Sequence, residues 1–139
     1  MTDYSSLNRV SRNWIVQAQS DLAAATANAE AGRHALACFL AHQAAEKAVV
    51  AFIYNHGAEH VWGHALADLC EDAKAFDPSF EFVKSVAGLL DRHDIGARYP
   101  QTLTGGAPCE AYEALDADRA LEIASEILRG IDEKLGLKQ

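Results

Sequence analysis

Residues Ala37–Ala51, ACFLAHQAAEKAVVA, decide the fold of this chain. The stretch is rich in alanine and has apolar residues on nearly every side, and a helix that is hydrophobic all round is normally buried between neighbours. Three polar residues within it, Gln43, Glu46 and Lys47, would then be partly removed from water and would need partners. The stretch therefore predicts a core helix whose polar side chains either pair inside the protein or form a ligand or subunit site.

Helical periodicity extends in both directions from this stretch. Apolar residues recur at the helical period, no segment alternates as a half-buried strand does, and the connections between successive helices are short. We expect helices over about residues 11–31, which would stop at Gly32, and over 33–54, 64–75 and 78–94, with Asp116 as the N-cap of the last helix. The predicted fold is all-α: an up-and-down antiparallel four-helix bundle with a fifth, C-terminal helix and a long loop, 95–115, before it. Residues 1–139 would form a single helical domain with its core at about 11–135.

Composition limits the kinds of partner. The chain has 139 residues and a formal net charge of −8, from 20 acidic and 12 basic residues, which argues against broad nonspecific phosphate binding but allows a small basic site. The three cysteines lack disulfide or zinc spacing, and the N-terminus lacks the apolar region of a signal peptide. Polar residues interrupt the longest apolar stretch, so we expect a cytoplasmic protein without a membrane span.

The polar group Gln43, Glu46 and Lys47 is the first candidate site. Residues at i, i+3 and i+4 share one face of a helix. An amide, a carboxylate and an ammonium on that face could hold a ligand or meet a charged loop. The alternative is an internal ion-pair network that orients the helices.

The second candidate is the segment DRHDIGARYP, residues 91–100, where the fourth helix is expected to end. The planar fork of arginine suits phosphate or carboxylate, and the histidine could titrate near neutral pH. The alternative is a loop anchored to the bundle, with Arg98 paired to Asp21 or Glu46 and Tyr99 packed over them.

Other chemistry has little support. Three histidines are spaced like a metal-binding stripe, His56, His60 and His64. Because Gly57 and Gly63 interrupt that region, we expect a polar loop and no metal site. His34 and His42 are expected at a surface or interface. No nucleophile elbow, P-loop or dinucleotide motif is present, and Cys38 is expected to be an inert core thiol, so we predict no cofactor.

Several short motifs follow one another in a specific order. They are WIVQAQSDL (14–22), Gly32 with ALACFLAHQAAEKAVVAFI (35–53) after it, His64-Ala-Leu, LDRHDIGARYP (90–100), and Asp118 with Ala120. In this order the chain resembles a stand-alone bacterial or archaeal HEPN domain over roughly residues 11–135. The resemblance implies a helical bundle, often a homodimer, which binds nucleotides or RNA. It also implies a frequent link to a small nucleotidyltransferase in two-component, toxin–antitoxin-like systems.

The resemblance also bears on catalysis. One large branch of the family cleaves RNA without a metal and uses an arginine followed four to six residues later by a histidine. In this chain Arg92 is followed six residues later by Arg98, which is a poor general base because it stays protonated. The usual catalytic pattern of that branch is therefore absent, and we do not predict RNA cleavage that depends on it.

Three hypotheses follow. The first is a non-catalytic binding module for a nucleotide or phosphate, beside a nucleotidyltransferase subunit, with ligand contacts from Lys47, Arg92, Arg98 and Tyr99. The residues expected to orient these contacts are Asp21, Gln43, Glu46, Asp91 and Asp94. The alternative is a metal-independent ribonuclease in which His93 is the acid or base and Arg92 and Arg98 stabilise the phosphate. The third is a purely structural or interaction dimer.

Overall fold

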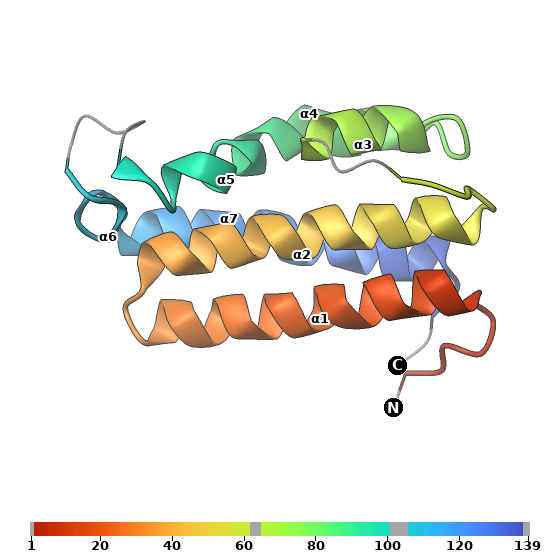
Figure 1. Cartoon of the computed structure of the whole chain (residues 1–139), viewed down its shortest axis with the longest axis horizontal. Helices are drawn as coiled ribbons and strands as arrows, with labels where there is room; N and C mark the ends of the chain where they lie inside the picture. The colour runs from red at the N-terminus through yellow and green to blue at the C-terminus, as the bar shows by residue number, and fades with distance from the viewer. Residues whose placement is uncertain (1, 62–64, 101–105, 138–139) are drawn as a thin grey trace.

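The computed structural model describes residues 2–61, 65–100 and 106–137. The regular elements in these ranges are α1 (Arg9–Glu30), α2 (His34–Asn55), α3 (Leu66–Ala73), α4 (Phe80–Asp91), α5 (His93–Gly96), α6 (Pro108–Ala111) and α7 (Ala114–Lys134). The long helices α1, α2 and α7 lie side by side, and α3 and α4 form a layer on the side of α2 opposite α1 (Figure 1). The predicted all-α class is confirmed.

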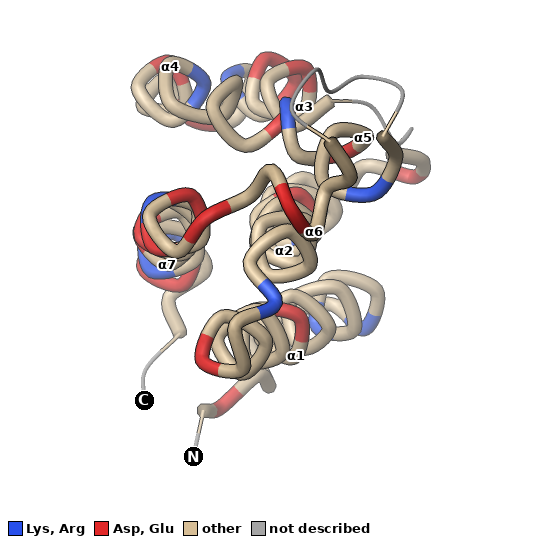
Figure 2. Tube along the Cα trace, turned by 90° about the vertical axis from the view of Figure 1, so that its left-hand side faces the viewer, with Lys and Arg blue, Asp and Glu red and all other residues tan. Residues whose placement is uncertain are grey.

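Helix α2 is the centre of the molecule, with α1, α7 and the α3–α4 layer around it (Figure 2). Several of its alanines are completely shielded from solvent: Ala37, Ala41, Ala44, Ala45, Ala48 and Ala51. Their small side chains let neighbouring helices approach from several directions. By length and composition α2 could also cross a membrane, but most of it is buried inside the protein, as in the core helix of a bundle. The predicted core helix is therefore confirmed.

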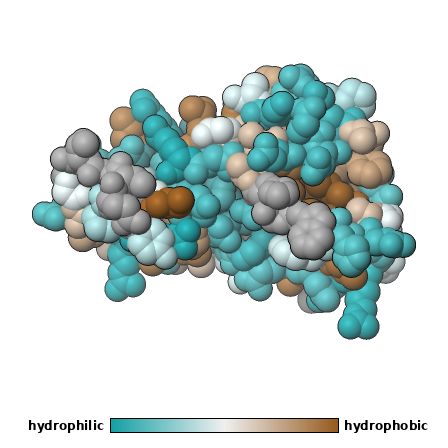
Figure 3. Space-filling model, turned by 45° about the horizontal axis from the view of Figure 1, so that its top comes forward, coloured by the Kyte–Doolittle hydropathy of each residue, from teal (hydrophilic) through white to brown (hydrophobic). Residues whose placement is uncertain are grey.

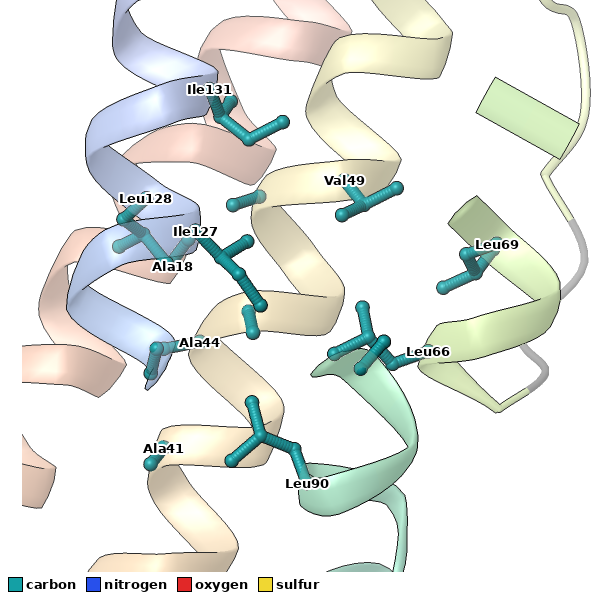
Figure 4. Packing of buried hydrophobic residues seen from close by; sticks show 14 of the residues in the cluster. Ala18, Ala41, Ala44, Val49, Leu66, Leu69, Leu90, Ile127, Leu128 and Ile131 are labelled. Atoms are coloured by element: carbon teal, nitrogen blue, oxygen red, sulfur yellow. The ribbon is translucent and has the colours of Figure 1, made fainter. Parts of the chain in front are cut away.

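Larger side chains from the surrounding helices fill the space beside these alanines. Leu66 and Leu69 of α3 lie on one side of α2, and Ile127 of α7 lies on another (Figure 4). Phe52 of α2 packs against Phe80 of α4 with ring centroids 4.7 Å apart, and both rings are buried. Buried side chains of α1, α2, α3, α4 and α7 thus form one hydrophobic core.

Gly32 separates α1 from α2, as predicted. Its φ of +81° lies in the left-handed region, which glycine adopts at little cost. The Gly32 amide donates to the Ala29 carbonyl at 3.0 Å, and the Arg33 amide donates to the Asn28 carbonyl at 2.9 Å. These bonds satisfy carbonyls at the end of α1 and turn the chain sharply into α2.

Two helix ends differ from the prediction. Helix α4 ends at Asp91, not near Asp94, because the chain turns at Arg92 before the single turn of α5. Asp116 is the third residue of α7, not its N-cap, which is Glu113. The Asp116 carboxylate accepts from the Glu113 amide at 2.8 Å. An acid in the first helical turn thus produces a sequence signal similar to that of a cap.

The stretch predicted as a long loop, 95–115, is partly helical. It contains the end of α5 and all of α6, which starts with Pro108 at its first position. Helices of one turn are too short to show periodicity, so the sequence pattern missed them. Residues 101–105 of this stretch, and His64 of the predicted histidine stripe, lie outside the described residues.

Candidate ligand site

Lys47 and Asp21 join α2 to α1. The Lys47 Nζ donates to Asp21 Oδ2 at 2.5 Å, and Gln17 Nε2 donates to Asp21 Oδ1 at 2.8 Å. The Lys47 side chain is 25% exposed and that of Asp21 12%. Asp21 thus orients Lys47, but it also neutralises the ammonium that was predicted to contact a ligand.

The other polar residues of α2 surround His42. This residue is only 1% exposed, so the prediction of a surface or interface position was wrong for His42. Gln43 Nε2 lies 3.5 Å from His42 Nδ1, and a Glu46 carboxylate oxygen lies 3.8 Å from the same nitrogen. Burial raises the pKa of Glu46, and the nearby carboxylates of Asp94 and Asp91 add to that effect. In the single chain, Gln43 and Glu46 therefore both have His42, a residue of the same helix, as a polar neighbour.

Asp91 connects this group to the outer layer. Its Oδ1 accepts from His42 Nε2 at 2.9 Å and from the Leu66 amide at 2.6 Å, and its Oδ2 accepts from the Ala67 amide at 3.0 Å. The last residue of α4 therefore caps the first turn of α3, whose own N-cap position, Ala65, has no side-chain acceptor. The sequence predicted Asp91 to be an orienting residue, but no pattern in it indicated a contact with the first turn of α3.

Arg98 lies at the surface, just after α5. Its Nε donates to the Asp94 carbonyl at 2.6 Å, and its Nη2 donates to Asp94 Oδ1 at 3.3 Å. The guanidinium lies 4.6 Å from the ring centre of Phe39 and 5.0 Å from that of Tyr99. The predicted pairing of Arg98 with Asp21 or Glu46 was wrong, because the partner is one local helical turn away.

Lys47 and Arg98 consequently occupy separate places. Phe39, beneath Arg98, and Lys47 are eight positions apart on α2, which is about 12 Å along the helix axis. Arg98 lies towards the start of α2, whereas Lys47 lies near its middle and contacts α1. The predicted ligand contacts do not form one cluster in the single chain.

A cavity of about 430 Å³ opens beside Arg98 at the start of α2. The residues that line it are Gly32, Arg33, His34, Ala35, Leu36, Ala97, Arg98, Pro108 and Cys109. No side chain of the described residues caps the N-terminus of α2, and its first turn contains no acid. The His34 Nδ1 is buried and has no hydrogen-bond partner among the described residues.

This cavity is bordered by the N-terminus of α2 and by two arginines, one of which, Arg98, pairs with Asp94. The first amides of a helix carry a partial positive charge, so cations are unfavourable at a helix N-terminus and anions are favourable. Here two arginines, Arg33 and Arg98, lie at that end of α2 with no compensating acid in its first turn. Sequence reasoning missed Arg33 and His34, although two basic residues at an expected helix start were a usable signal.

His93 is buried, whereas both arginines of the predicted catalytic set, Arg92 and Arg98, are exposed. The histidine is only 3% exposed, and its Nδ1 lies 3.0 Å from the Tyr112 hydroxyl. Burial, with a contribution from the charge of Arg92, lowers the pKa of His93 to about 4. Arg92 is exposed and does not line the cavity. In the single chain His93 is therefore neutral near pH 7 and shielded from a substrate.

The buried, neutral state of His93 predicts acid sensitivity. Between pH 6.5 and about 4 the unfolded chain binds a proton on this histidine and the native chain does not, so stability falls as the pH falls through that window. We expect the wild-type free energy of unfolding to lose about 2 kcal/mol more than that of His93→Phe between pH 7 and pH 5. Urea titrations at the two pH values measure this difference.

Tyr112→Phe is the control for that comparison, because it removes the hydroxyl partner but keeps the buried imidazole. It should retain most of the wild-type pH dependence. Equal pH dependence in the wild type and in His93→Phe would contradict the assignment.

The remaining histidine predictions concern the segment after α2. His56 is the C-cap of α2, and its ring packs between Phe52 and Phe76, at 4.3 and 5.0 Å between centroids. Its Nδ1 lies 3.0 Å from the Phe52 carbonyl oxygen. Within the described residues no group of three or more His, Cys, Asp or Glu side chains is arranged to hold a metal ion.

The buried thiols lie in the core. Cys38 and Cys70 are fully shielded from solvent, and burial raises the pKa of each to about 12. Neither thiol is available as a nucleophile at neutral pH.

Comparison with known proteins defines the class. A family model described as the HEPN domain matches residues 11–134, which is most of the chain. This helical protein therefore belongs to the HEPN domain family, as its resemblance predicted. No curated protein matches the chain.

Solved structures agree with this assignment. TT1696 from Thermus thermophilus is 35% identical, with a TM-score of 0.83, over 89% of this chain and 97% of that one. ST0689, an archaeal HEPN homologue, is 33% identical, with a TM-score of 0.74, over 90% and 97% of the two chains. An HEPN domain protein from Thermotoga maritima, TM0613, is 29% identical, with a TM-score of 0.71, over 89% and 98%.

Proposed function

We propose that this chain is a binding module for the phosphate group of a nucleotide, and that the ligand sits in the cavity at the start of α2. The observation that supports this most directly is the position of Arg98. Arg98 lines the cavity together with Arg33 and the first turn of α2, which no described side chain caps. Backbone amides and arginine forks are the groups that proteins use to bind phosphate.

The surroundings of Arg98 suit this role. The faces of Phe39 and Tyr99 support the guanidinium, and Asp94 orients it without enclosing it, since the side chain remains 37% exposed. A cavity of about 430 Å³ is within the usual range of small-molecule sites, roughly 300–1,000 Å³. The partly exposed Tyr99 ring lies beside Arg98 but does not line the cavity, so it could contact only the part of a nucleotide that extends beyond it.

In this proposal Lys47 is a structural residue. Its ammonium already has a carboxylate partner in Asp21, and its position on α2 is remote from Phe39. Arg92 is exposed and could contact an extended ligand or RNA. The ribonuclease alternative has less support, because its only candidate acid or base, His93, is buried and neutral.

Thermal unfolding with added nucleotide tests the binding site. With AMP, ADP or ATP at ten times the dissociation constant, the wild type should gain about 1.4 kcal/mol, or roughly 4 °C in Tm. Arg98→Ala should remove most of this gain, since a charge-assisted hydrogen bond contributes about 1.5–3 kcal/mol. Arg33→Ala should reduce it as well.

The matched control is Arg129→Ala. Arg129 is an exposed arginine on α7 that pairs with Glu126 one turn away, much as Arg98 pairs with Asp94. This variant should keep the full nucleotide shift. A wild type that no nucleotide stabilises, or equal shifts in all variants, would contradict the proposed site.

The proposed partner is a small nucleotidyltransferase in a two-component, toxin–antitoxin-like system, and the proposed assembly is a homodimer. Both rest on family membership. Affinity purification from native cells at low salt, with mass spectrometry of protein and nucleotide, tests this. Recovery of a nucleotidyltransferase supports the pairing, whereas a clean homodimer without that partner counts against it.

A further inference from the structure

An apolar groove runs between α4 and α7, away from the proposed phosphate cavity. Its volume is about 660 Å³, and its walls are Phe82, Val83 and Val86 from α4 and Ile123 and Ile127 from α7. On the face that Figure 3 shows, apolar residues reach the surface as separate patches among hydrophilic ones. This groove is distinct because its apolar residues are continuous along two helices.

The groove is open to a partner side chain. Phe82 is 76% exposed, the largest exposure among the large hydrophobic residues that the structure describes. Gly130, at the α7 side of the groove, has no atom within 4 Å of the place where a side chain would begin. An exposed aromatic ring next to a hollow lined by aliphatic residues is typical of a protein interaction site.

The charges along the groove select the partner. Glu122 and Glu126 lie on its α7 side. Glu122 has no ion-pair partner among the described residues, and Glu126 pairs with Arg129. The one lysine that lines the groove, Lys134, is bound to Asp77 at 2.7 Å and to Ser79 at 2.5 Å. Among the described residues that line the groove, Glu122 is therefore an acid that no free base balances.

We propose that this groove binds an amphipathic α-helix of a partner protein, with apolar side chains at i, i+3 or i+4 and i+7 and with Lys or Arg beside them. Two roughly parallel helices with a hollow between them can accept a third helix, whose apolar face then replaces water on Phe82, Val86 and Ile123. A basic residue of the partner pairs with Glu122, because Glu126 already has Arg129 as its partner. A second copy of this groove is a poor occupant, because symmetric pairing would bring together two grooves that each carry this unbalanced acid.

The test uses three fluorescein-labelled 18-residue peptides and the full chain. The first peptide has Leu at i, i+3, i+4 and i+7 with Lys on the flanks, the second has Glu in place of Lys, and the third is a scrambled form of the first. Fluorescence polarisation should detect binding of the first peptide, and binding at least about tenfold weaker for the other two.

Variants locate the binding. Phe82→Ser and Glu122→Lys should each weaken the first peptide by about tenfold, and only the Glu122→Lys effect should shrink at high salt. Leu89→Ser is the matched control, because Leu89 is an exposed leucine of the same helix that does not line the groove. It should leave binding unchanged.

Two results would overturn the proposal. One is equal affinity for the amphipathic and scrambled peptides, or equal affinity in Phe82→Ser and the wild type. The other is a wild-type dimer, measured by light scattering, that Phe82→Ser converts to a monomer, since that would assign the groove to a second copy of this chain. Neither result depends on nucleotide binding.

Discussion

Phe52→Ala is expected to lower the free energy of unfolding by about 4 kcal/mol, the largest single effect among these predictions. The Phe52 ring is only 2% exposed and packs on Phe80 and on His56. It connects the central helix α2 to α4. Truncation would remove this burial and leave a cavity between helices that cannot close without moving α4.

The comparison for this prediction is the same substitution at an exposed position. Phe82→Ala, on α4, removes a ring that is 76% exposed and should change the free energy of unfolding by less than about 0.5 kcal/mol. Urea titrations of both variants give the difference directly. A loss of under about 1 kcal/mol for Phe52→Ala would mean that the α3–α4 layer is not firmly packed on α2.

The position of α2 could be predicted because its composition suits only the centre of a bundle. Alanines on every side, as at Ala41, Ala44 and Ala48, leave no face suited to solvent, so the helix has to be surrounded. Glycine at position 32 likewise indicates the turn, since its backbone adopts the left-handed conformation found there. Both features depend on local sequence alone.

The parts of the site that depend on distant contacts could not be predicted in the same way. Lys47 was predicted as a ligand contact and Asp21 as an orienting residue, but nothing in their spacing shows that they pair. The sequence does not show which nearby acid pairs with Arg98. In the structure, the single turn of α5 brings Asp94 next to it. The cavity at the start of α2 requires Gly32 and the first turn of α2 to meet Arg98, after α5, and Pro108, at the start of α6, which periodicity does not reveal.

Asp91 is the clearest example of a residue whose role depends on distant contacts. Those contacts lead to the second prediction of a large effect on stability. Asp91→Ala is expected to lower the free energy of unfolding by about 3 kcal/mol, although its side chain is 20% exposed. The substitution removes the acceptor for the first amides of α3, which as a helix cap contributes about 1 kcal/mol. It also leaves the buried ring of His42 without its carboxylate, at a cost of about 1–3 kcal/mol.

Two variants separate these contributions. Asp91→Asn keeps one oxygen acceptor for an α3 amide, and it should lose less stability than Asp91→Ala. Asp94→Ala removes a half-exposed carboxylate whose ion-pair partner among the described residues is Arg98, and it should cost less than about 1 kcal/mol. Equal losses for Asp91→Ala and Asp94→Ala in urea titrations would show that the α3 cap contributes little.

The same residue links stability to the proposed ligand site. Asp91 fixes the end of α4, and α5 begins two residues later and leads directly to Arg98. In Asp91→Ala, loss of the cap should therefore displace Arg98 and so weaken the stabilisation by nucleotide indirectly. Arg98→Ala should remove the stabilisation by nucleotide but should lower the stability of the free protein much less. A thermal unfolding series with and without nucleotide distinguishes the two: Asp91 is assigned as a positioning residue if its variant begins from a lower Tm and retains part of the shift.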